Sequence, residues 1–142
     1  MTPASVTTRN LGVNIDEQLT FDAHPRACSR ACFYHLRRIR QVRRFLNEQA
    51  PNQLVLAFVS SRLDYCNAIL ADCSAAVRRR LERIQNNAAR LICSEPNSAH
   101  VTPLLKRLHW LAVEKRITYK LCVLMFDVMH GSATQYLTEM FS

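Results

Sequence analysis

The residues from Ser74 to Cys93 constrain the fold of this chain more than any other stretch. They contain no glycine and no proline, and their apolar side chains recur at the spacing of one helix face, namely Val77, Leu81, Ile84, Ala88, Leu91 and Ile92. Ser74, just before this pattern, is a favourable N-cap residue. Such a helix must bury its apolar face against other elements, and the opposite face presents Arg79, Arg83, Asn86 and Arg90.

The remaining chain favours further helices, because two glycines and five prolines among 142 residues leave few sharp turns. A first long helix is predicted from about residue 22 to residue 46. Its core face carries cysteine, leucine, isoleucine and valine, and the other face carries Arg26, Arg30, Arg37, Arg40 and Arg44. Phe33 falls among these arginines, where it can stack on a base or pack beneath a neighbouring segment, and packing is the commoner role.

Three more helices are expected. One begins at Pro51 and reaches Leu70, is apolar nearly all round in its first part, and holds Arg62 and Asp64 as a buried pair that fixes register. A short helix follows, with Thr102 as N-cap and Pro103 as its first residue.

The last long helix, 113–130, follows Trp110, which should fill the joint, and ends at Gly131. Its middle is apolar on almost every side, so other helices or a separate partner should cover it.

The predicted fold class is mainly α, a helical bundle of about four to five helices with a short N-terminal extended segment. Residues 1–20 are expected to form a loose N-terminal segment in which 11–16 alternates as a strand without a partner sheet. Residues 21–142 are expected to form one helical domain.

The net charge of +8 arises mostly from sixteen arginines against three lysines. Arginine pairs bidentately with phosphate and stacks on bases, so this bias fits a nucleic-acid partner. A solvated basic surface explains the charge equally well.

Catalytic and cofactor signatures are absent from the sequence. No Asp-Asp pair is available to hold polymerase metal ions, no glycine-rich loop can cradle a phosphate, and the six cysteines show no zinc spacing. We therefore expect no enzyme activity, no cofactor and no metal. No apolar run is long enough to span a membrane and no signal peptide is visible, which predicts a nuclear or cytoplasmic protein with reduced cysteines.

Three blocks resemble the segment downstream of the catalytic palm in reverse transcriptases of non-LTR (LINE-class) retrotransposons. They are SRLDYCNAIL at 61–70, RRLERIQNNAARLI at 79–92 and HVTPLLKRLHWLAVEKRITYKL at 100–121. The resemblance extends from Leu11 to about Leu137 and implies a helical thumb region that tracks the template–primer backbone, without the palm that carries the catalytic aspartates.

RNA or an RNA–DNA hybrid is then the expected partner. Helical phase, and not a family motif, selects the arginines for phosphate contact: Arg30, Arg37, Arg40, Arg44, Arg79, Arg83 and Arg90. Further expected partners are the missing palm and fingers chain and a second copy of this chain. The alternative interpretations are a helical protein-interaction module and a relic of a mobile element without function.

Overall fold

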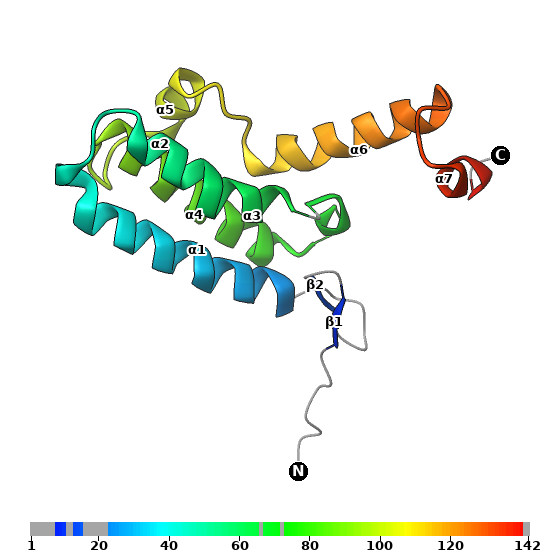
Figure 1. Ribbon diagram of the computed structural model, residues 1–142, viewed down its shortest axis with the longest axis horizontal. Coiled ribbons are helices and arrows are strands. Elements are labelled where there is room, and N and C mark those ends of the chain that lie inside the picture. The colour runs from blue at the N-terminus through cyan, green and yellow to red at the C-terminus, as the bar shows by residue number, and fades with distance from the viewer. Residues whose placement is uncertain (1–7, 11–12, 16–22, 66, 72, 141–142) are drawn as a thin grey trace, which may run out of the picture.

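A computed structural model describes residues 8–10, 13–15, 23–65, 67–71 and 73–140, and it is mainly helical. The helices α1 to α5 form a bundle, and α6 leads away from it toward α7 at the far end of the molecule (Figure 1). The predicted helical-bundle class is confirmed. None of the described helices is long and apolar enough to cross a membrane.

Helix α1 (Ala23–Val42) continues into a 3₁₀ turn at Arg43–Phe45. Its buried stripe includes Cys32, Leu36 and Ile39, as the helical spacing predicts. Burial of this stripe leaves the arginines of the other face in solvent.

The second predicted helix is shorter than expected and is less central. It consists of α2 (Ala50–Val55), a π-helical turn (Leu56–Ser60) and α3 (Ser61–Asp64), and a separate 3₁₀ turn covers Asn67–Leu70. The prediction of one helix through Leu70 is wrong, because the backbone becomes extended at Tyr65.

The buried residues of the α2–α3 segment are Pro51, Val55, Val59, Ser60 and Leu63. Leu56 and Phe58 are 45% and 41% exposed, so the expectation of a helix buried on every side is also wrong. The segment covers α1 from one flank and faces solvent on the other.

The predicted Arg62–Asp64 pair does not form. Arg62 is exposed and donates a hydrogen bond to the carbonyl of Phe58, four residues earlier in its own helix. Asp64 instead accepts from Arg116, 52 residues further along the chain, with 2.8 Å between the nitrogen and the oxygen.

Helix α4 (Ala75–Cys93) matches its prediction closely. The Ser74 hydroxyl accepts a hydrogen bond from the Val77 N–H at 3.3 Å, which confirms the N-cap. Val77, Leu81 and Ile84 lie in the main core against α1 and α2. The helix closes where Ser94 adopts a left-handed conformation (φ 58°) and the Glu95 N–H reaches the Arg90 carbonyl at 2.9 Å.

Helix α5 (Val101–Arg107) begins two residues earlier than predicted. His100 is the residue at the N-cap and Thr102 lies inside the helix, so the assignment of Thr102 as N-cap is wrong. Leu104 packs with Ala89 and Cys93 in a second, smaller core. Trp110 is half-buried and packs against both cores, which confirms that it fills the joint before α6.

For helix α6 (Val113–Met129), the sequence predicted cover by other helices or by a separate partner, and the structure shows that other helices do not supply it. Only its first turns contribute buried residues, Val113 and Ile117, and the apolar middle is not wrapped by other helices. Gly131 follows with φ 67°, so the predicted glycine stop is confirmed. We call α6 together with α7 (Gln135–Met140) the C-terminal arm.

Strands β1 (Thr8–Asn10) and β2 (Val13–Ile15) form a short antiparallel pair with Thr8 opposite Ile15. The expected strand therefore has a partner, supplied by residues that the sequence pattern assigned to a loose segment. Strand β2 also contacts α1. The other residues of the predicted N-terminal segment lie outside the described ranges.

Candidate nucleic-acid interface

Two helices supply all seven arginines selected from the sequence. Arg30, Arg37 and Arg40 lie on α1, Arg44 follows in its 3₁₀ turn, and Arg79, Arg83 and Arg90 lie on α4. Helices α1 and α4 pack side by side with their C-terminal ends together, as the contact between Arg43 and Leu91 shows (Figure 1). The two arginine rows therefore belong to adjacent helices.

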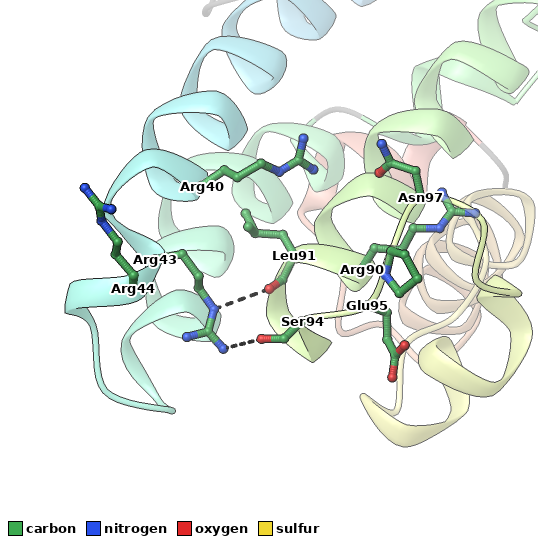
Figure 2. A pocket seen from close by; sticks show the side chains of 9 residues that line it. Arg40, Arg43, Arg44, Arg90, Leu91, Ser94, Glu95 and Asn97 are labelled. Atoms are coloured by element: carbon green, nitrogen blue, oxygen red, sulfur yellow. Dashed lines mark hydrogen bonds between the residues drawn. The ribbon is translucent and has the colours of Figure 1, made fainter.

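The rows meet at a groove of about 590 Å³ between the C-terminal ends of α1 and α4. Arg40, Arg44 and Arg90 line it together with Arg43 and the loop that follows α4. Figure 2 shows Arg40 reaching from α1 over this groove, whereas Arg44 points away from it. The structure thus brings three of the seven predicted residues to one place.

Arg43 was not selected from the sequence, yet it connects the two helices. Its Nη2 donates to the Ser94 hydroxyl at 2.8 Å and its Nε to the Leu91 carbonyl at 3.5 Å (Figure 2). A cation at this position also complements the negative ends of both helix dipoles. Helical phase aligns Arg43 with the core stripe of α1, but the residue lies in the 3₁₀ turn after Val42, where its side chain is half-buried.

Arg90 has a structural partner of its own. Its Nε and Nη2 both donate to the carbonyl of Ala99, at 3.2 and 3.1 Å, and its side chain is half-buried. This bidentate contact holds the loop between α4 and α5. Arg90 is therefore less available to a ligand than its helical phase suggests.

The other selected arginines are exposed: Arg30, Arg37, Arg40, Arg44, Arg79 and Arg83. Within the described ranges, no residue forms a hydrogen bond or salt bridge with these six guanidinium groups. Arg44 stacks over the ring of Phe45, 4.7 Å from the ring centroid, and Phe45 is itself 74% exposed. A flat cation on an exposed ring is a surface on which a base or sugar can stack.

Phe33 takes the packing role. It is half-buried and packs against the main core, although it lies in the same helical sector as the arginines. The stacking surface at this end of the bundle is therefore Phe45 with Arg44.

The cysteines and carboxylates form no metal centre within the described part of the chain, where no group of three His, Cys, Asp or Glu residues converges. The described cysteines are free, and Cys28 and Cys32 lie one helical turn apart with 3.9 Å between their sulfur atoms. The hydrogen bond from Cys32 lowers the pKa of the Cys28 thiol, and the same contact together with burial raises the pKa of Cys32.

Comparison with known proteins gives no match: no protein-family model, no curated protein and no solved structure is similar to this chain at a significant level. The arginine rows and the groove between α1 and α4 must therefore be interpreted from their own chemistry.

Proposed function

We propose that this chain is a non-catalytic, thumb-like module that binds the backbone of RNA or an RNA–DNA hybrid through the arginine faces of α1 and α4. The single observation that carries the proposal is the pair of adjacent arginine rows, six of whose guanidinium groups are exposed. From Arg30 to Arg44 the row on α1 extends over about 20 Å at the rise of an α-helix. Such a row can follow successive phosphates without reading base sequence.

The proposed origin is a LINE-class reverse transcriptase, based on the three sequence blocks at 61–70, 79–92 and 100–121. In such an enzyme the palm performs the chemistry, and this chain contains no Asp-Asp pair to hold two metal ions. We propose that the purified chain extends no primer with magnesium or manganese. Template-dependent nucleotide incorporation that persists through repurification would contradict this. The nucleus or the cytoplasm, where such templates occur, is the proposed location.

The test of the binding function is a salt titration. If about five arginines contact phosphates, log affinity should fall against log salt with a slope of roughly −3.5 to −4.5. Between ~50 and ~200 mM salt, binding should then weaken on the order of a hundredfold or somewhat more. A chain that has no affinity for RNA or the hybrid even at low salt would refute the proposal.

A pair of charge-matched variants locates the contact face. Arg37→Gln with Arg44→Gln should flatten the slope by about 1.4 to 1.8 units, because each lost phosphate contact removes about 0.7 to 0.9 of a unit. The control, Arg38→Gln with Arg107→Gln, removes the same charge from exposed positions outside the two rows. Both variants keep long side chains with good helix propensity, so circular dichroism should not change. Equal slopes for the two double variants would exclude α1 as the contact face.

The alternative function, a helical protein-interaction module, is favoured by one specific observation. The C-terminal arm exposes Tyr119, Met125, Phe126 and Met129 by 46% or more. An apolar surface of this kind usually meets a partner, here the missing palm and fingers chain or a second copy of this chain. The two functions use different surfaces and are compatible.

A further inference from the structure

Three aromatic rings touch one another on the side of the bundle where α1 meets the π-helical turn at Leu56–Ser60. The rings of Tyr34 and His35 meet edge to face with 5.4 Å between their centroids. His35 in turn stacks on Phe58, with 4.9 Å between the centroids and 17° between the ring planes. We call these three residues the aromatic flank. The contacts proposed above between arginines and phosphates leave it without a role.

Two rings of the aromatic flank are open to solvent. Tyr34 is 60% exposed and Phe58 is 41% exposed. A ring that faces water can receive a planar ligand, and every nucleic-acid base has a planar face. Phe58 also lies in a π-helical turn, a rare conformation that is frequent at functional sites. The aromatic flank thus offers ring surface that the fold itself does not cover.

Exposed cations border Tyr34 on α1. Arg30 lies four residues before it and Arg37 three residues after it, and residues at these spacings are neighbours on a helix surface. Both arginines are exposed, and within the described ranges neither forms a hydrogen bond or salt bridge. Tyr34 therefore lies between two guanidinium groups that are available to phosphates.

The charge of this surface favours an anionic ligand. Helix α1 contains five arginines and neither Asp nor Glu. The α2–α3 segment has no carboxylate before Asp64, which pairs with Arg116. An apolar protein surface would offer these arginines no counter-charge, whereas a single-stranded nucleic acid supplies phosphates for the arginines and bases for the rings. A duplex offers its phosphates, but its bases are already stacked on one another.

We propose that the aromatic flank is a stacking site for the unpaired bases of single-stranded RNA whose backbone follows Arg30 and Arg37. One base stacks on the Tyr34 ring and another on Phe58, while phosphates pair with the two arginines. This role rests on the proposed function and deepens it, because α1 contacts the backbone in either case. The aromatic flank adds affinity for segments that are not base-paired.

The test compares three short fluorescein-labelled ligands of equal length on the intact protein by fluorescence anisotropy. They are an unstructured RNA strand of mixed sequence, the same strand annealed to its DNA complement, and an abasic strand with the same number of phosphates. The parent should bind the RNA strand about fivefold or more tighter than the abasic strand, as expected when at least one base stacks on an aromatic side chain.

Variants of Tyr34 assign this difference to the aromatic flank. Tyr34→Ala should weaken binding of the RNA strand about fivefold or more and of the hybrid less than about twofold, without changing the salt slope, because no phosphate contact is lost. Tyr34→Phe keeps the ring and should bind as the parent does. The matched control is Tyr119→Ala, which removes a tyrosine that is 62% exposed on the arm and should leave binding of both ligands unchanged.

Phe58→Leu tests the second ring. The variant keeps an apolar side chain and should also weaken the RNA strand more than the hybrid. Because Phe58 contacts His35, circular dichroism and the melting temperature are measured with it. Tyr34 is exposed and alanine has the highest helix propensity, so Tyr34→Ala tests the site even where Phe58→Leu is destabilised.

Three results would overturn this role while backbone binding stands. They are equal affinity of the parent for the RNA and abasic strands, an equal loss for strand and hybrid in Tyr34→Ala, and a loss in Tyr34→Phe as large as in Tyr34→Ala. Unchanged binding of the RNA strand in Tyr34→Ala would also overturn it and would leave a protein as the partner of the aromatic flank. A parent that binds none of the three ligands at low salt would instead refute the proposed function, and this role with it.

Discussion

The bundle and the C-terminal arm differ in both charge and burial. Residues 113–142 contain three basic side chains and three acidic ones, Lys115, Arg116 and Lys120 against Glu114, Asp127 and Glu139, so the whole formal charge of +8 belongs to residues 1–112. The bundle buries its apolar stripes and exposes arginine, whereas the arm exposes apolar side chains. The bundle is thus suited to an anionic polymer and the arm to an apolar surface.

The largest expected effect concerns folding stability. Ile84 is fully buried where α4 packs in the main core, and Ile84→Ala should lower the free energy of unfolding by ~2–5 kcal/mol. Met129→Ala, at a position 78% exposed in the arm, should change it by less than about 0.5 kcal/mol. Urea denaturation of the two variants measures this contrast.

Equal losses in the free energy of unfolding for Ile84→Ala and Met129→Ala would contradict the difference in burial between the two regions. They would mean that the arm is covered in solution, for example by self-association, and that Met129 is buried there. Repeating the denaturation at tenfold lower protein concentration would test for self-association, because stability supplied by association depends on protein concentration.

The contrast between the regions also shows what sequence periodicity can and cannot predict. The periodicity located α4, its Ser74 N-cap and the exposed arginines, because the apolar stripe and the cap are local properties of the chain. For α6 the sequence predicted cover by other helices or by a separate partner, because periodicity indicates how apolar a helix is and not which neighbours reach it.

Sequence periodicity does not predict contacts between residues that are far apart in the chain. Asp64 pairs with Arg116, which is 52 residues away, although Arg62 is its nearer basic neighbour in sequence. Arg43 was not selected as a binding residue because helical phase places it on the core stripe, whereas the 3₁₀ turn that contains it begins directly after Val42. The Asn67 Oδ1 accepts no hydrogen bond from a described residue, and this too depends on which residues surround it in three dimensions.

An intermediate effect is expected for exposed apolar side chains of the arm. The intact chain should bind a hydrophobic dye, self-associate, or do both, because α6 presents Met125, Phe126 and Met129 to solvent. Met125→Gln with Met129→Gln should reduce dye fluorescence by about half or more, while the salt slope for nucleic acid stays unchanged. Dye fluorescence and sedimentation of parent and variant provide the measurement.

A matched control keeps this result specific to the arm. Val42→Gln with Leu56→Gln removes two exposed apolar side chains of the bundle, which are 44% and 45% exposed, and should reduce dye binding less. A monodisperse parent that melts cooperatively and binds no dye would contradict the assignment of the arm as an apolar docking surface.

The smallest expected effect is on the pH dependence of stability, and it concerns two histidine–phenylalanine stacks, one in each region. His35 of α1 stacks on Phe58 of the neighbouring segment with 4.9 Å between ring centroids, whereas His130 stacks on Phe126 at the end of α6 at 3.9 Å. Burial, and then the nearby Arg62 charge, lower the pKa of His35 below its ordinary value near 6.5. The folded chain therefore takes up this proton less readily than the unfolded chain does.

The sign of the pH dependence follows from that shift. The contribution of His35 is fully present above its unfolded pKa near 6.5 and is lost as the pH falls from there through the folded pKa. His35→Phe keeps a ring against Phe58 and should reduce the fall in stability between about pH 7.5 and pH 5.5, measured by urea denaturation at each pH. His130→Gln is the control, because its stack lies within one segment of the arm, and it should leave the stability of the bundle nearly unchanged at both pH values. A steeper pH dependence in His35→Phe than in the parent would show that protonated His35 stabilises the fold, and that the contact between α1 and Phe58 does not favour the neutral ring.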